Sequence, residues 1–343
     1  MPAHVSEPVT VLPPYKVTTA EIGADVRARH AEHPRLPVFL RVIEGCGVAE
    51  RYFTRPFEEV VAANGAAHRM SSAFTDAAGL AVEAARGALE HTGLHAAEVD
   101  AMITSHTTSW AVPNLDVRLV AELGLRPEIC RLPMGSLACA GGAQALIRAA
   151  DLLKARPGAK VLVVVAEVLS AIYHRDEDSV ESMIYKALFG DSAGACVVTD
   201  APLGPGLAVE ETFEYVLPDS LDRYWGRVDA AGLHFDSTKK ALAAPGEAMP
   251  RVLEWLRGWR PSFAVIHPGG PRIITGTTAA LGLDAGSARH SLDSLEQSGN
   301  LGGNAVLDIL RRSHASPPAP GTGGLLLAFG PGFTVAAVRG IWN

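Results

Sequence analysis

The chain has 343 residues, of which 48% are hydrophobic and 20% are charged, and its formal net charge is −7 at pH 7. This length allows two domains or one large α/β unit, and the composition excludes a disordered protein. The negative charge argues against binding of nucleic acid or an anionic membrane surface, so an anionic ligand would need local basic residues.

The four cysteines form no CxxC pair and have no histidines at metal-ligand spacing. We therefore expect free thiols and no structural zinc. The first ten residues lack the basic and apolar segments of a signal peptide, and the longest apolar runs are too short to span a bilayer. These features predict a cytoplasmic protein.

The first half of the chain alternates between helical and β-type patterns. We expect helices at residues 18–33, 71–93, 115–123 and 143–156, and strands at residues 99–104, 160–167 and 189–199. The continuous Val-rich run at 160–167 is typical of a central strand that is buried on both faces. A Pro- and Gly-rich break at 201–206 ends this half.

The second half repeats the same alternation after the break. We expect helices at residues 250–259 and 304–313, strands at 263–267, 324–329 and 334–339, and a flexible surface connector at 317–324. Two successive α/β halves predict a layered α/β/α architecture with an internal duplication. The division that follows is 1–200 for the N-terminal half and 201–343 for the C-terminal half.

Cys139 stands at the start of an expected helix, within the sequence SLACAGG. Its neighbours are too small to cover the thiol, and the backbone N–H groups and dipole at a helix start favour a thiolate. The pattern fits an acyl-transfer nucleophile, but it also fits a buried cysteine in a tight turn. The choice depends on whether a base and an oxyanion-stabilising group occur elsewhere.

Two other segments can supply those groups. His267 ends an expected strand and is followed by PGGP, which lets the backbone pass close to a ligand, although a histidine at a strand end is often structural. Asn300 lies in a Gly-rich loop, where Asn304 is the better candidate for the helix N-cap. A Cys–His pair can form a thiolate and an imidazolium, and His and Asn N–H groups can stabilise an oxyanion or enolate. The three residues together predict thioester acyl transfer with carbon–carbon bond formation.

Five motifs occur in order along the chain: CAGG at Cys139, FGD at 189–191, HPGGP at 267–271, the GN loop at Asn300 and AFGPG at 328–332. In these motifs the chain resembles the type III polyketide synthases, the chalcone synthase-like branch of the thiolase superfamily, over roughly residues 35 to 340. The resemblance implies the duplicated, five-layered αβαβα thiolase fold and a homodimer. It also implies CoA thioesters as substrates, namely malonyl-CoA and an acyl-CoA starter, and no further cofactor.

The resemblance also implies the roles of the site residues. Cys139 would carry the starter and the growing polyketide as a thioester, with its own backbone N–H as oxyanion donor. His267 and Asn300 would bind the malonyl thioester and stabilise the enolate that decarboxylation forms. Attack of this carbanion on the Cys139 thioester would add two carbons, and the product would be cyclised in the same cavity. Ala138 replaces a common family glycine, which we expect to be tolerated if its φ is not positive.

The family's cavity positions also map onto this chain. Phe189 and Phe235 match the two gatekeeper aromatics between the CoA tunnel and the cavity, and core packing is compatible with that role. The remaining cavity residues are Thr107, Val112, Leu169, Ile172, Gly226, Gly302 and Pro331. The apolar members favour an apolar or aromatic starter.

The CoA entrance departs from the plant pattern. Val38 and Gly45 replace two family lysines, so that only one of three basic positions is kept. The basic residues that we expect to bind CoA are Arg41, Arg51 and Arg272, with Arg55 nearby. The reduced basic set leaves room for an acyl-carrier protein as the starter donor.

The motifs leave other functions open. A single-condensation ketosynthase III-like enzyme or an acyltransferase could use the same Cys-His-Asn triad, although the ketosynthase III branch normally has an HQAN-type motif where this chain has HPGG. A catalytically silent paralogue would be expected to have lost one of the three residues, and all three are present. A papain-like thiol hydrolase would leave the AFGPG segment unexplained.

Overall fold

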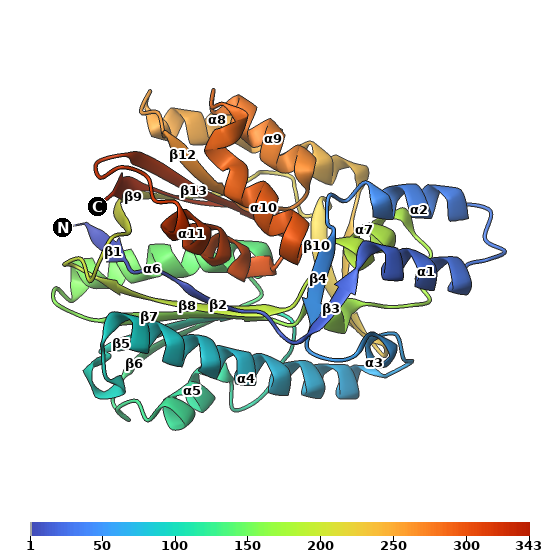
Figure 1. Ribbon diagram of the computed structural model, residues 1–343, viewed down its shortest axis with the longest axis horizontal. Coiled ribbons are helices and arrows are strands. Elements are labelled where there is room, and N and C mark those ends of the chain that lie inside the picture. Colours follow the sequence, from blue (N-terminus) through green and yellow to red (C-terminus); the bar gives the residue numbers. More distant parts are fainter. Residues whose placement is uncertain (1) are drawn as a thin grey trace.

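A ten-stranded mixed sheet runs through the middle of the computed structural model, which describes residues 2–343 (Figure 1). The strands are β1 Ala3–Val5, β2 Val9–Val11, β3 Tyr15–Thr18, β4 Glu50–Phe53, β5 Ala101–His106, β6 Cys130–Gly135, β7 Val161–Glu167, β8 Ser192–Thr199, β9 Leu207–Val216, β10 Tyr224–Asp229, β11 Gly232–Ser237, β12 Phe263–Ile266, β13 Gly323–Gly330 and β14 Thr334–Trp342. The order in the large sheet is β12-β13-β14-β9-β1-β8-β7-β5-β6, with β2 paired to β8. Two hairpin sheets, β3–β4 and β10–β11, stand apart from it.

Most of the helices pack on the faces of this sheet, whereas α1, α2, α3 and α7 lie at the right of the view (Figure 1). They are α1 Thr19–Arg29, α2 Leu36–Glu44, α3 Phe57–Val60, α4 Ala66–Thr92, α5 Leu115–Leu123, α6 Gly141–Ala155, α7 Val180–Leu188, α8 Ala244–Leu256, α9 Pro271–Ala280, α10 Arg289–Ser298 and α11 Ala305–Ala315. In the view of Figure 1, the sheet has an upper arm, which includes β9, β12 and β13, and a lower arm, which includes β5, β6, β7 and β8. Helices α8 and α9 lie above the upper arm, α4 and α5 lie below the lower arm, and α6 and α11 lie between the two arms. None of these helices is long and apolar enough to cross a membrane.

Side-chain alternation along the buried strands produces these layers. In β7, Val163 faces the central helices α6 and α11, whereas Val164 faces α4 and α5. In β13, Leu326 faces the same central helices, whereas Leu325 packs against α8. The order helix, sheet, helix, sheet, helix confirms the expected αβαβα thiolase architecture.

Several predicted elements have the expected type but different ends. Helix α5 matches its prediction, since Asn114 caps its start and Gly124, at φ 66°, ends it. Helix α4 begins at Ala66, five residues earlier than predicted, because its polar first turn hides the apolar periodicity. Helix α8 begins at Ala244 and keeps Pro250 in its interior, whereas the sequence analysis took this proline as the helix start.

The predicted strand 189–199 begins only at Ser192. Phe189 instead ends helix α7 and forms an isolated parallel bridge with Asn300. The Asn300 N–H donates to the Leu188 carbonyl at 2.7 Å, and the Gly190 N–H donates to the Asn300 carbonyl at 3.1 Å. The segments around Phe189 and Asn300, which are more than 100 residues apart in the sequence, are therefore joined through their backbones.

Candidate active site

Cys139 lies in a 3-10 turn, Ala138–Ala140, that leads directly into helix α6. Small residues are needed here because other backbone segments approach closely. A Cβ at Gly141 would lie 2.2 Å from the Ser105 hydroxyl, and a Cβ at Gly142 would lie 2.2 Å from the Gly303 carbonyl oxygen. The CAGG motif therefore packs a helix start against its surroundings, and Cys139 itself is buried.

Ala138 adopts φ 45°, so the condition stated for its tolerance is not met. This left-handed conformation favours glycine and is strained for alanine. The Ala138 N–H is held by the Thr107 hydroxyl at 2.9 Å, which fixes the turn next to the thiol. Backbone strain is thus stored beside the sulfur atom.

His267 directly follows strand β12, and its backbone N–H donates to the Leu327 carbonyl at 2.9 Å. The imidazole is buried, and its Nδ1 has no hydrogen-bond partner among residues 2–343. Its Nε2 lies 3.4 Å from Asn300 Nδ2. The ring is therefore positioned by the end of the strand and not by an orienting carboxylate.

Asn300 connects the other two residues of the predicted triad. Its Oδ1 accepts from the Gly302 N–H at 2.9 Å, which fixes the amide orientation. The amide nitrogen then points toward Cys139 Sγ, at 3.9 Å, and toward His267 Nε2, at 3.4 Å. The structure thus brings the three predicted residues together around one donor. Asn304 stands before helix α11 but caps nothing with its side chain, because its Nδ2 donates to the Ser192 hydroxyl.

Burial keeps the thiol and the imidazole neutral. Burial, together with the nearby Glu167 carboxylate, raises the pKa of Cys139 to about 12. It lowers the pKa of His267 to about 3. Desolvation disfavours the charged form of each group and here outweighs the helix start. Both shifts oppose the expected thiolate–imidazolium pair in the free protein.

Glu167 is a buried carboxyl that the sequence analysis missed. It is the last residue of β7, and burial raises its pKa to about 7. Its Oε2 accepts from the Thr107 N–H at 3.2 Å, while its Oε1 finds no partner in the part of the chain that the structure describes. A charged residue at the end of the otherwise apolar run VLVVVAE was the signal that could have revealed it.

An apolar cluster lies beside the Cys139 turn and contains most of the expected cavity residues. The rings of Phe189 and Phe235 lie 6.1 Å apart, and both belong to the cluster that includes Ala138. The other members named from the sequence are Leu169 and Ile172, with Thr107, Gly226 and Gly302 adjoining through Ala138, Phe235 and Leu169. Val112 is the exception, since it is 79% exposed and lies outside this cluster.

Tyr224 is a further member that the sequence did not indicate. Its ring lies 5.5 Å from that of Phe235, and its buried hydroxyl has no hydrogen-bond partner in the described chain. Burial raises the pKa of this phenol well above its usual value, with nearby Cys139 contributing. Its carbonyl accepts from the Gly332 N–H in the turn that contains Pro331. A Cβ at Gly330 would lie 2.8 Å from that of Ala140, so the AFGPG turn packs against the Cys139 turn.

The basic residues of the expected CoA entrance separate into two kinds. Arg51 is completely buried, and its guanidinium donates to the carbonyls of Val17 and Ala187 and to the Thr19 hydroxyl. It cannot bind a phosphate at the surface, so its assignment to CoA was wrong. Arg55 is occupied by Asp76, which accepts two of its hydrogen bonds.

Arg41 and Arg272 are exposed and remain available. Arg41 lies in the last turn of α2, and Arg272 lies in the first turn of α9. A Cβ at Gly47 would lie 2.5 Å from Pro271 Cγ, so the loop after α2 touches the start of α9. No group of three or more His, Cys, Asp or Glu side chains in residues 2–343 is arranged to hold a metal ion.

Comparisons with known proteins match the whole chain. The family model of the N-terminal domain of chalcone and stilbene synthases matches residues 57–202, and the model of their C-terminal domain matches residues 209–340. A phloroglucinol synthase from Pseudomonas fluorescens is 31% identical over 98% of this chain and 98% of that protein.

Solved structures agree with these matches. A 1,3,6,8-tetrahydroxynaphthalene synthase from Streptomyces coelicolor, a bacterial type III polyketide synthase, superimposes with a TM-score of 0.96 at 32% identity, covering 99% of each chain. A germicidin synthase from Streptomyces coelicolor, also a type III polyketide synthase, gives a TM-score of 0.96 at 32% identity over the full length of both chains.

Proposed function

Because the chain belongs to the family of chalcone and stilbene synthases, and is thus a type III polyketide synthase, we propose that Cys139, His267 and Asn300 are its catalytic residues. The observation that carries this proposal is the Asn300 amide, which points toward both the thiol and the imidazole. Malonyl-CoA extends an acyl starter that is bound to Cys139, and the enzyme is an acyltransferase.

Loading begins with a neutral thiol and a neutral imidazole. Only the unprotonated imidazole can accept a proton, and burial maintains that form by lowering the pKa of His267. His267 takes the proton from Cys139 as the sulfur attacks the acyl thioester, and it returns this proton to the CoA sulfur, so that CoA leaves as a thiol when the tetrahedral intermediate collapses. The backbone N–H of Cys139 stabilises the oxyanion of the tetrahedral intermediate.

Extension uses the same site with a different division of labour. The malonyl thioester carbonyl accepts hydrogen bonds from Asn300 Nδ2 and from His267 in its Nε2–H tautomer, which lie 3.4 Å apart. Loss of CO2 leaves an enolate on this oxygen, and the two donors stabilise its charge in a site that excludes water. The carbanion attacks the Cys139 thioester, and the carbon–carbon bond forms as the thiolate leaves.

The surroundings of the site support a role in substrate choice. Phe189 and Phe235 act as gatekeepers, and the apolar cluster around Leu169 and Ile172 favours an apolar or aromatic starter whose product is cyclised in place. Arg41 and Arg272 bind the CoA phosphates. Since these two residues are few and exposed, an acyl-carrier protein is the second candidate donor, and comparing Cys139 loading from acyl-CoA and from acyl-carrier protein decides between them.

We also propose a cytoplasmic homodimer whose subunits divide into halves 1–200 and 201–343. Strand β6 is an exposed edge of the large sheet, and Trp110, Val112 and Leu132 expose apolar surface near it. An exposed apolar edge favours pairing with a second copy. The halves are supported by the repetition of a 3-10 turn followed by a buried helix, at Ala138–Ala140 before α6 and at Gly302–Asn304 before α11.

Replacement of each triad residue tests the catalytic assignment. Cys139→Ala should abolish acyl loading, as measured by intact-protein mass spectrometry, yet keep decarboxylation of malonyl-CoA. His267→Ala and Asn300→Ala should suppress CO2 release. Normal product formation by Cys139→Ala, or unchanged CO2 release by the other two variants, would contradict the assignment.

A further inference from the structure

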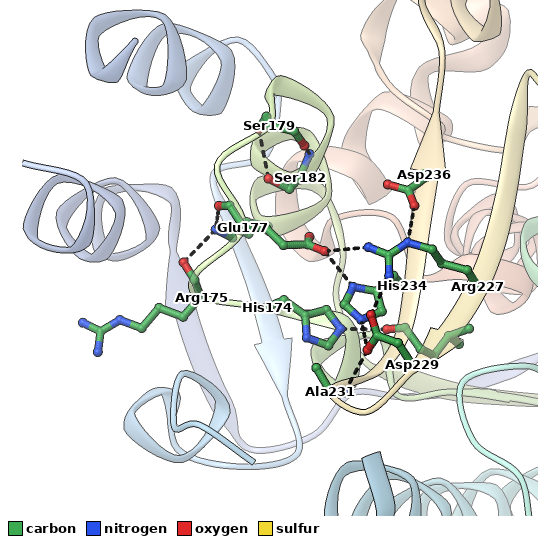
Figure 2. A network of polar contacts seen from close by, with 12 residues as sticks. His174, Arg175, Glu177, Ser179, Ser182, Arg227, Asp229, Ala231, His234 and Asp236 are labelled. Atoms are coloured by element: carbon green, nitrogen blue, oxygen red, sulfur yellow. Dashed lines mark hydrogen bonds and ion pairs between the residues drawn. The ribbon is translucent and has the colours of Figure 1, made fainter. Parts of the chain in front are cut away.

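The β10–β11 hairpin separates a charged face from an apolar face. Its strands pair Gly226 with Phe235 and Arg227 with His234, and neighbouring pairs project to opposite faces of a β-ribbon. One face therefore carries the gatekeeper ring beside the Cys139 cluster. The other face carries an ionic network that faces away from the chemistry, and we call this network the hairpin lock (Figure 2).

His234 is the centre of the hairpin lock and is only 5% exposed. Its Nδ1 lies 2.6 Å from a Glu177 carboxylate oxygen, and its Nε2 lies 2.9 Å from an Asp229 carboxylate oxygen. Figure 2 shows these two carboxylates at the two nitrogens of the ring. Each ring nitrogen of His234 therefore has a carboxylate oxygen within hydrogen-bond distance, one from the loop that carries Glu177 and one from β10.

The His234 ring rests on a second histidine. The rings of His174 and His234 are stacked, with centroids 3.7 Å apart and planes 11° apart. His174 Nε2 lies 2.8 Å from the Leu233 carbonyl oxygen. Burial lowers the pKa of His174 to about 4, and the charge of His234 contributes. The stacking therefore holds the His234 ring against the segment that carries His174.

The loop that supplies Glu177 is itself held in place. Lys186 is buried in α7, and its Nζ donates to the carbonyls of Arg175, at 3.0 Å, and Glu177, at 2.7 Å. Arg227 donates to Asp236 within the hairpin, at 2.7 Å, and to Glu177 of the loop, at 3.4 Å. The lock thus connects a rigid helix to the hairpin through paired charges.

The hairpin needs such an attachment because it has only two strands, and an isolated pair of strands is marginally stable. Its apolar face places Phe235 6.1 Å from Phe189 and 5.5 Å from Tyr224, by ring centroids. Gly226 lies opposite Phe235 in the register, and a Cβ there would lie 3.3 Å from the Phe235 ring. Movement of β11 would therefore move the ring that borders the Cys139 cluster.

Resting on the proposed function, we infer that His234 is a positioning residue for substrate size. Its ring ties the β10–β11 hairpin to the loop at residues 174–177 and thereby fixes Phe235, which limits the acyl group that fits beside Cys139. When the lock is loosened, longer acyl groups gain access, while the chemistry at Cys139 continues.

The test compares acetyl-CoA with octanoyl-CoA as starters, each with malonyl-CoA, and measures kcat/KM for both. In His234→Gln the octanoyl-to-acetyl ratio rises about fivefold or more, because side chains that shape a pocket discriminate strongly between acyl lengths. Glu177→Gln loosens the lock from a partly exposed loop and gives a smaller rise in the same direction. His290→Gln is the matched control, since it removes a histidine that pairs with Asp293 of its own helix α10, and its ratio stays within about twofold of wild type.

The double variant His234→Gln/Glu177→Gln provides a rescue. Two amides can hydrogen-bond to each other without an unpaired buried charge, so the ratio returns toward that of wild type, which a general loss of structure would not allow. The inference is overturned if the ratio is unchanged or lowered in both single variants, His234→Gln and Glu177→Gln. If His234→Gln does not fold, the Glu177→Gln single variant decides. If wild type itself neither acylates Cys139 nor condenses, the proposed function fails; if wild type is active and the ratios do not move, only the inference fails.

Discussion

The neutrality of His267 makes a signed prediction about stability. Burial lowers the pKa of this imidazole from its usual 6.5 to about 3. Protonation therefore favours the unfolded chain between these two values, and the stability that the neutral ring contributes is complete above about pH 6.5 and is lost as the pH falls. An imidazolium paired with a thiolate would have its pKa raised instead, and protonation would then favour the folded chain.

The magnitude follows from the size of the pKa change. Each pH unit between the unfolded and folded pKa values contributes about 1.36 kcal/mol. At pH 5, which is about 1.5 units below the usual pKa, His267 destabilises the wild-type fold by about 2 kcal/mol relative to pH 8. At pH 3 the destabilisation is about 4 kcal/mol, and it approaches about 5 kcal/mol at lower pH.

The measurement is the difference in free energy of unfolding between wild type and His267→Gln, from urea titrations followed by tryptophan fluorescence. Other titrating groups occur in both proteins and cancel in this difference. We expect the difference to shift by about 2 kcal/mol in favour of His267→Gln between pH 8 and pH 5. A difference independent of pH would refute the buried neutral imidazole, and a shift in favour of wild type would restore the ion pair.

Three further predictions concern neighbours of Cys139. Ala138→Gly relieves the strain of φ 45° and should raise the free energy of unfolding by about 0.5–1 kcal/mol; a lower Tm contradicts this. Gly302→Ala places a Cβ at φ 59°, 3.1 Å from Glu167 Cγ and 3.2 Å from Leu169 Cδ1, which should cost about 1–3 kcal/mol of stability and shorten the polyketide products, whereas wild-type Tm and products refute the contact. Glu167→Gln removes a negative charge that raises the pKa of Cys139, so alkylation of Cys139 by iodoacetamide at pH 8 should accelerate roughly three- to tenfold. At pH 6, below the pKa of about 7 of Glu167, the two proteins should react alike, and an equal rate at pH 8 excludes the charge effect.

The sequence predicted the meeting of the triad because each residue stands at the end of a recognisable element. Cys139 starts a helix, His267 follows a strand, and Asn300 lies in a glycine-rich loop before another helix. The apolar run of β7 likewise identified a strand covered by helices on both faces. Ends of buried elements gather at one edge of a layered fold, so chemistry placed there can be inferred from one-dimensional patterns.

Other features could not be inferred, because they depend on burial and on backbone torsion. The charge of Arg51 suggested a phosphate partner, yet the side chain is enclosed and bonded to backbone carbonyls. The apolar side chain of Val112 suggested a pocket, yet it faces outward. The positive φ of Ala138 has no compositional signal. The β10–β11 hairpin was missed because both strands are short and carry polar residues, and β10 is largely exposed.

The backbone bridge between Phe189 and Asn300 limits how this enzyme can be altered by evolution or by design. The backbone of Asn300 makes two hydrogen bonds to Leu188 and Gly190, the residues on either side of Phe189, so neither segment can shift without the other. Exchanges of the Phe189 side chain can widen the passage while leaving that scaffold intact. Insertions or deletions between 188 and 190 would change the register of the bridge and misplace Asn300, so diversification of substrate range at this point proceeds by substitution at constant loop length.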